Sequence, residues 1–370
     1  MSFWNLFKKK KKPNKKNNKS PLVLNKIIKK PVIDDSEELI IDDALLEELI
    51  YKWESGEEII DALVNEANEQ TDGNVKFIEY LVNLIDQEKL EIPMLPDIVM
   101  KMISLSKNPD TDIKDYVSVI KSDQAIALKI IKLANSPLYK GIRDVNDLNL
   151  AISRIGVNEL KNLVLMLSLQ SKIFNNKEFK DTIDEIWKTS LLTSILSSRL
   201  AKYYSLDQSK AYTIALTHDV GEIIIFNSVK SYERFYKQKY KTTAFFVKRI
   251  SKSFHQQISA FTLSRWNFSK EQVDIVRNHH TLPNEDSNNY HKLLFISYQT
   301  SVILLSFKFN KDNINNFPYE FLIKFSKLPL SEDAFYLLLK DSLQEFSSLS
   351  SIISWLIIPF LKECIELLGF

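Results

Sequence analysis

The chain has 370 residues, 45% of them apolar, so it is long enough to bury a sizeable core and is not disordered as a whole. Its single cysteine, Cys364, excludes a disulfide framework and fits a reducing, cytoplasmic compartment. The net charge is only +2, but residues 1–30 hold 11 Lys and no acid, while residues 34–91 hold 19 Asp or Glu against 3 Lys, so neighbouring segments carry opposite charge.

Residues 1–33 are predicted to form a disordered basic tail with an aromatic start. Aromatic side chains insert at a lipid headgroup boundary, and lysines are attracted to an anionic surface. One interpretation is therefore peripheral contact with the inner face of the cytoplasmic membrane; the alternative is a solvated tail, and no nucleic-acid partner is expected. The membrane-surface candidates are Phe3, Trp4, Phe7, Lys8, Lys9, Lys10, Lys11 and Lys12.

Residues 34–87 are acidic and have helical spacing. Apolar side chains recur at steps of three and four residues between Leu39 and Trp53. Asp35 with Glu38 is typical of a capping box at the start of a helix. Because acidic faces are usually solvated, we interpret this region as a small helical lid on the main domain, with a partner-docking region as the alternative.

Residues 88–308 are predicted to be a succession of helices. The prolines of Ile92–Pro96 predict an extended entry, and Thr111 and Ser122 are predicted to cap the two helices that follow. A later helix should end at Gly156, because glycine suits a left-handed C-terminal position. No Asn-Gly or Asp-Gly turn separates alternating strands, so the expected fold class is all-α.

A series of motifs in this region resembles HDOD domains in order and approximate spacing. The motifs are Pro93-Met-Leu-Pro96, Ser122-Asp-Gln, Lys132-Leu-Ala-Asn-Ser-Pro137, Ala151-Ile-Ser-Arg-Ile-Gly156, Trp187 with Ser190, Thr217-His-Asp-Val-Gly221, and a closing segment from Phe254-His255 through Trp266 to His279-His280. The resemblance implies an all-α, HD-like domain with an N-terminal helical half. It also implies kinship with the HD metal-dependent phosphohydrolases, in a family found mainly in bacterial signalling proteins and often without catalytic activity.

The adjacent His218-Asp219 pair lies in an apolar run, residues 211–226, that has helical spacing, and imidazole with carboxylate suits a divalent transition metal. The resemblance implies two further ligands in HD hydrolases, a His on an earlier helix and a later Asp. Thr189 stands at the first position, and the expected helix 291–305 contains no acid. After their paired histidines, the related cyclic-dinucleotide phosphodiesterases carry an acid and a Gly-Tyr-Pro loop, which this chain lacks.

We therefore expect no catalysis and no cofactor at this degenerate site. The interpretation is a polar structural cluster, with a residual non-catalytic divalent metal as the alternative. Its members are Thr189, His218, Asp219, His255, His279 and His280.

The expected function is that of a bacterial signal-transduction output or adaptor protein, not an enzyme, that acts through contact with a protein partner. Two alternatives stay open: a metal-dependent HD-type phosphohydrolase of a nucleotide or cyclic dinucleotide, and a non-catalytic nucleotide sensor. Residues 309–370 are predicted to form a helical C-terminal extension, rich in aromatic residues, that packs on the domain or presents an exposed face.

Overall fold

The structure of the protein, a computed structural model, describes residues 72–86, 89–106, 108, 110–136, 138–139, 141–172, 178–306, 308–309, 314–317, 319 and 330–367. The membrane-surface candidates, Phe3 to Lys12, lie outside these residues, as does most of the acidic region 34–87.

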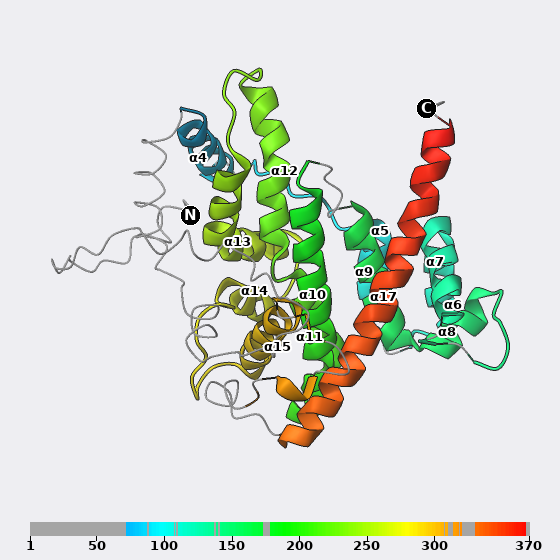
Figure 1. Cartoon of the computed structure of the whole chain (residues 1–370). Helices are drawn as coiled ribbons and strands as arrows, with labels where there is room; N and C mark the ends of the chain where they lie inside the picture. Colours follow the sequence, from blue (N-terminus) through cyan, green and yellow to red (C-terminus); the bar gives the residue numbers. More distant parts are fainter. Residues whose placement is uncertain are drawn as a thin grey trace, which may run out of the picture.

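Helices dominate the described ranges, and no strand occurs within them (Figure 1). The expectation of an all-α fold is therefore confirmed. The helices are α4 (Asp72–Asp86), α5 (Asp97–Ser106), α6 (Ile113–Lys121), α7 (Gln124–Ala134), α8 (Leu148–Ile155), α9 (Val157–Lys172), α10 (Lys180–Ala201), η2 (Lys202–Tyr204), α11 (Gln208–Thr217), α12 (Val220–Phe235), α13 (Ala244–Arg265), α14 (Lys270–Arg277), α15 (Asn289–Ser306), η3 (Ile314–Asn316) and α17 (Glu332–Leu367).

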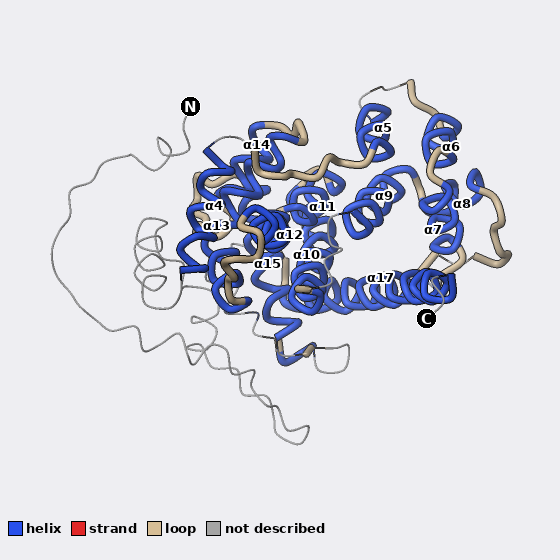
Figure 2. The backbone as a smooth tube through the Cα atoms, turned by 90° about the horizontal axis from the view of Figure 1, so that it is seen from above, coloured by secondary structure: helices blue, strands red, loops and turns tan. Residues whose placement is uncertain are grey.

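Helix α10 lies in the middle of the molecule. Helices α5 to α9 lie on one side of it, and α12 to α15 lie on the other (Figures 1 and 2). The side chains of Leu191 and Ile195 on α10 are buried in a core that both sides share. The extended entry before α5 also connects the two sides, because the indole nitrogen of Trp266 donates a 2.9 Å hydrogen bond to the carbonyl oxygen of Pro93.

The N-terminal caps of α6 and α7 differ from the predicted ones by one residue. Asp112 caps α6 in a capping box, and Asp123 caps α7. The hydroxyls of Thr111 and Ser122 instead donate to backbone carbonyls of the preceding helices, those of Leu105 and Val119. These hydroxyls therefore bond to the helix that precedes them, and the carboxylate of the next residue accepts hydrogen bonds from the first free N–H groups of the helix that follows.

Helix α8 ends as predicted. Its last residue is Ile155, and Gly156 follows with φ of 89°. A side chain would be strained at this positive φ, which glycine adopts readily.

The predicted C-terminal extension packs on the domain over the first part of α17. Leu338 and Leu339 of α17 are buried in a second core with Leu192 and Leu196 of α10. Arg199 on α10 forms an ion pair with Glu345 on α17. No helix in the described ranges is long and apolar enough to cross a membrane.

Candidate functional site

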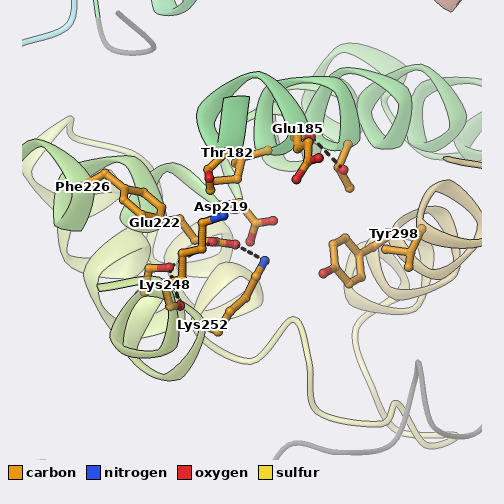
Figure 3. A pocket seen from close by; sticks show the side chains of 12 residues that line it. Thr182, Glu185, Asp219, Glu222, Phe226, Lys248, Lys252 and Tyr298 are labelled. Atoms are coloured by element: carbon orange, nitrogen blue, oxygen red, sulfur yellow. Dashed lines mark hydrogen bonds and ion pairs between the residues drawn. The ribbon is translucent and has the colours of Figure 1, made fainter. Parts of the chain in front are cut away.

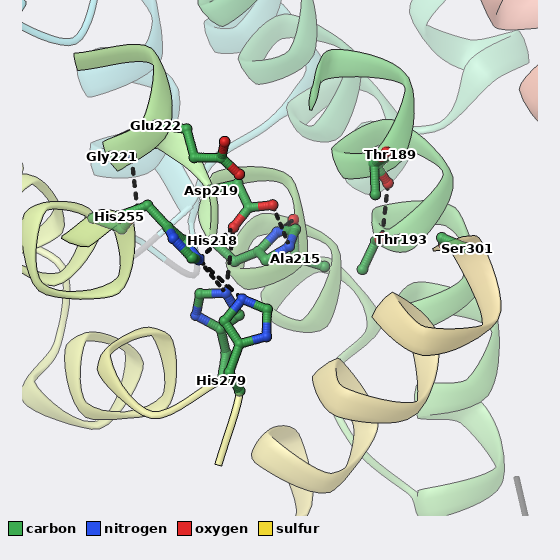
Figure 4. Close-up of polar contacts among 12 residues, drawn as sticks. Thr189, Thr193, Ala215, His218, Asp219, Gly221, Glu222, His255, His279 and Ser301 are labelled. Atoms are coloured by element: carbon green, nitrogen blue, oxygen red, sulfur yellow. Dashed lines mark hydrogen bonds and ion pairs between the residues drawn. The ribbon is translucent and has the colours of Figure 1, made fainter. Parts of the chain in front are cut away.

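The apolar run 211–226 predicted one helix that contains the His218-Asp219 pair, but the structure divides this run into two helices. The pair forms a two-residue break between α11, which ends at Thr217, and α12, which begins at Val220. The break frees both side chains from helical spacing, and both are buried. The His218 ring Nδ1 donates to the carbonyl oxygen of Ala215 at 2.6 Å, which holds the ring in place (Figure 4).

Gly221, the last residue of the motif, lets α12 approach the backbone of α13. A Cβ atom at Gly221 would lie 2.3 Å from the carbonyl oxygen of His255 and 2.6 Å from the backbone nitrogen of Ser259. The Gly221 N–H donates instead to Ser259 Oγ at 2.8 Å. This close contact brings His255 to Asp219.

The Asp219 carboxylate lies among three histidines (Figure 4). Its Oδ1 is 3.4 Å from Nε2 of His255 and 3.3 Å from Nε2 of His279, and its Oδ2 is 3.1 Å from Nε2 of His218. The Nε2 atom of His255 is also 3.3 Å from that of His279 and 2.9 Å from that of His280. The structure therefore brings together every histidine that the sequence placed in the cluster.

Backbone contacts settle where the protons of two of these rings lie. His279 Nδ1 is 2.6 Å from the carbonyl oxygen of Val276, and His255 Nδ1 is 2.9 Å from that of Lys252. A carbonyl oxygen only accepts, so in each ring Nδ1 carries a proton. In the neutral rings both Nε2 atoms then present lone pairs toward each other and toward Asp219 Oδ1.

The pKa shifts favour an ionised Asp219 carboxylate and neutral rings at His255, His279 and His280. Burial raises the pKa of Asp219, but its interactions with His218, His279 and His255 outweigh burial and hold the pKa well below its usual range. Burial lowers the pKa of His255 to about 3, and it also lowers the pKa of His279 and His280. Each of these rings therefore has a lone pair available at neutral pH.

The residues present fit a divalent metal. Asp219, His255, His279 and His280 each offer one ligand atom, and the four atoms lie within 4.8 Å of one another. Ligands at about 2.0–2.1 Å from a tetrahedral metal are themselves about 3.3 Å apart. The His255–His279, His255–His280, Asp219–His255 and Asp219–His279 separations, 2.9 to 3.4 Å, are close to that value. Ligating histidines usually donate their other ring N–H to a carbonyl, as His255 and His279 do.

Such a metal would have four protein ligands. Catalytic zinc sites keep one position open for water, whereas structural sites are closed. The donor set of three imidazoles and one carboxylate would suit zinc, iron or nickel. The chemistry that a metal would supply here is charge compensation for the buried carboxylate and a link between α12, α13 and the segment after α14.

A cavity of about 310 Å³ opens beside Asp219 (Figure 3). Three of its lining residues, Glu222, Lys252 and Tyr298, are not among the site residues predicted from the sequence. Glu222 is buried on α12 and forms a 2.6 Å ion pair with Lys252, whose side chain is half exposed. Both lie three residues along a helix from a cluster residue, Asp219 or His255, and this spacing was the available signal.

Thr189 lies in the wall of this cavity but does not join the cluster (Figure 4). Its hydroxyl donates to the carbonyl oxygen of Glu185 at 3.0 Å, one turn earlier on α10. Helix α15 faces the same cavity with Tyr298 and Val302, and its residues include no acid. Thr189 and α15 thus add no metal ligand to the cluster, and Glu185, the acid that α10 contributes to the cavity wall, lies outside the group of four converging ligand atoms.

The HDOD domain model matches residues 92–282, just over half of the chain, and this range contains the whole cluster. The chain belongs to the HDOD domain family. The family range ends two residues after His280, and the predicted limits of 88–308 stay a prediction.

Solved HD-like structures share the fold of this HDOD protein. A candidate metal-dependent phosphohydrolase from Shewanella amazonensis is 22% identical, with a TM-score of 0.55 over 74% of this chain and 100% of that one. An HDOD domain protein of unknown function from Geobacter sulfurreducens is 19% identical, with a TM-score of 0.51 over 77% of this chain and 97% of that one. At these identities the likeness shows the fold alone.

Among the curated proteins, an uncharacterised protein from Treponema pallidum is 25% identical to the HDOD protein over 206 residues. The match covers 52% of this chain and 38% of that one, so the chain spans well under half of that relative's length.

Proposed function

We propose that this HDOD protein is a non-catalytic output or adaptor protein of bacterial signal transduction that acts through contact with another protein. In this proposal the histidine and aspartate cluster is a structural hub that joins α12, α13 and the segment after α14. The observation that carries the proposal is that neither expected further ligand joins the cluster: Thr189 uses its hydroxyl within α10, and α15 contributes no acid. Glu185 of α10 also lines the cavity, but it is outside the group of four residues whose ligand atoms converge.

The hub is placed where a conformational signal could cross the domain. Trp266, whose indole bonds Pro93 on the N-terminal side, ends the helix that carries His255. A partner that shifts either side of α10 would therefore act on elements that the cluster holds together.

Catalysis is tested with full-length protein loaded with manganese or iron. We expect no hydrolysis of nucleotides, cyclic dinucleotides or phosphodiester analogues above the metal-only background. Turnover that is lost in His218→Ala would overturn the proposal. A pull-down from host lysate with the full chain, using a charge-reversed α5–α6 surface as control, then tests for a specific partner.

A metal-dependent phosphohydrolase is the second candidate, because the cavity reaches the same carboxylate that the metal-ligand set contains. In that case Lys252 and Tyr298 would face the bound substrate, and a bound metal would supply Lewis-acid chemistry. Metal content together with turnover separates the two candidates, since a structural site binds metal without turning over substrate.

The same cavity favours a further candidate, a nucleotide sensor without catalysis. A volume of about 310 Å³ lies at the small end of ligand pockets. A thermal shift with nucleotides that disappears in Lys252→Ala and persists in Lys248→Ala would support sensing, since only Lys252 is paired with a buried carboxylate.

Peripheral membrane contact through the tail stays a proposal as well. Liposomes with anionic lipid should retain the full chain and release a variant that lacks residues 1–12. Equal co-sedimentation of both proteins would remove the tail as an anchor.

A further inference from the structure

The tip where α12 turns into α13, residues 230–241, is strongly basic. It carries five cationic residues against one acid, Glu233. All five cations are exposed, and none forms an ion pair with a residue that the structure describes. They are Lys230, Arg234, Lys237, Lys239 and Lys241.

The tip also exposes aromatic surface. The ring of Phe235 is 66% exposed, although its centroid lies 5.4 Å from that of Tyr80 on α4. Tyr236 packs against Phe235 and Tyr240 with centroid distances of 4.9 and 5.3 Å. An exposed aromatic ring among unpaired cations is typical of a surface that binds an anionic and partly apolar partner.

The chain enters the described structure directly at this tip. Gly73, in the first turn of α4, accepts a 2.7 Å hydrogen bond from Tyr232 Oη through its carbonyl oxygen. A Cβ atom at Gly73 would lie 2.0 Å from the carbonyl oxygen of Lys241, so the two backbones touch. Gly73 therefore lies against Lys241, two residues along the chain from the end of the acidic segment.

That segment has the opposite charge. Residues 34–71 hold 14 Asp or Glu and one Lys. Glu69 and Glu66 are three and six residues before Asp72, so even a fully extended chain keeps them within about 20 Å of Asp72. A short tether gives an effective concentration in the millimolar range, so weak pairs suffice to hold the contact.

We propose that the acidic segment 34–71 docks in cis on the basic tip of residues 230–241. The acids of 54–71 pair with Lys237, Lys239 and Lys241, and apolar side chains of the segment cover Phe235. Docking would hide a cationic surface, so an anionic partner of this protein must displace the segment before it can bind the tip.

Zero-length carbodiimide cross-linking of the full chain, followed by mass spectrometry, tests the contact. We expect links from Lys237, Lys239 or Lys241 to acids of residues 54–71. In an equal mixture of ¹⁴N- and ¹⁵N-labelled protein, these links should join peptides of a single label. Links that mainly join the acids to Lys8–Lys12, links of mixed label, or no links at the tip would each overturn the proposal.

A charge-reversal variant gives an independent readout. Lys237→Glu/Lys239→Glu/Lys241→Glu should raise the cleavage rate of residues 54–69 by a glutamate-specific protease roughly three- to tenfold, since exposed pairs are individually weak. The matched control is Lys101→Glu/Lys114→Glu/Lys121→Glu on α5 and α6, which lie far from α4 (Figure 2) and change the charge equally. Equal cleavage of both variants would contradict docking.

Anionic vesicles test whether the basic tip binds a membrane surface instead of the acidic segment. If phosphatidylserine vesicles bind the wild-type chain through the three lysines while no cis cross-link forms, then the tip is a membrane contact and the proposal fails.

Discussion

Asp219 shares one carboxylate oxygen between His255 and His279, and both of those rings donate their other nitrogen to the backbone. The sequence favoured a metal-free cluster at this place, and that expectation stays a prediction. The lone pairs of these rings converge, and acceptors that face one another repel unless a cation or shared protons lie between them. This arrangement supports the alternative, a bound divalent metal.

The alternative, a residual metal, predicts about one divalent metal per chain in protein purified without chelator, since the cluster offers a closed four-ligand set, whereas a metal-free cluster predicts none. His279→Ala should lower the metal content below about a tenth of that value. His291→Gln is the control, because His291 is the one histidine outside the candidate cluster. Inductively coupled plasma mass spectrometry measures both, and full retention of metal by His279→Ala would rule out the assignment.

Gly221 should tolerate no side chain. Gly221→Ala places a methyl group against backbone atoms of α13, and we expect a loss of about 1–3 kcal/mol in the free energy of unfolding. Gly141→Ala is the control, since its nearest neighbour is the flexible end of Arg154 at 3.2 Å. Urea unfolding followed by circular dichroism measures the difference, and equal stability of the two variants would contradict the packing argument.

At the scale of elements, the sequence located helix starts to within one residue but chose the wrong capping side chain. Ser122 and Asp123 are both good cap residues, so local preference did not separate them. The structure separates them because the Ser122 hydroxyl donates to Val119 of the preceding helix, which leaves Asp123 to accept from Ile126. The break at His218-Asp219 was missed for a related reason, since apolar residues continue on both sides of it.

Asp123→Ala should therefore cost about 1 kcal/mol of stability, because it leaves N–H groups of α7 without a partner. Ser122 is the cap that the sequence predicted, but Ser122→Ala should change the free energy of unfolding by less than about 0.5 kcal/mol. Chemical denaturation of both variants measures the contrast. A larger effect at Ser122 would show that the hydroxyl caps α7 after all.

At the scale of the molecule, a group of polar contacts joins α9, α10 and α17 with the loop residue Tyr139. Glu159 on α9 accepts a 3.1 Å hydrogen bond from Tyr139 and lies near Glu345 of α17, which pairs with Arg199 of α10. Burial, followed by the charge of Glu345, raises the pKa of Glu159 to about 7. The carboxyl is therefore most stable in the fold when it is protonated.

A raised carboxyl pKa makes the fold lose stability as pH rises. The unfolded chain releases this proton near pH 4.5 and the folded chain near pH 7, so the free energy of unfolding falls between these values, by about 3 kcal/mol. Glu159→Gln should remove the fall and raise the melting temperature at pH 8. Thermal unfolding from pH 5 to 8 measures the pH dependence of the melting temperature, with Asp110→Asn at an exposed position as the control. The same pH dependence in the wild type, Glu159→Gln and Asp110→Asn would contradict the assignment to Glu159.

By itself the sequence determined the all-α fold, the HDOD motifs and the aspartate and four histidines of the cluster, because helical periodicity and motif order are local properties. The tertiary structure decided what the cluster can do. Only the packing of α12 on α13 at Gly221 shows that four ligand atoms meet within 4.8 Å of one another. Only the structure shows that Thr189 turns its hydroxyl to its own helix. Glu222 and Lys252 are 30 residues apart in the sequence and pair across two helices. The spacing of residues within one helix does not predict a partner on another helix.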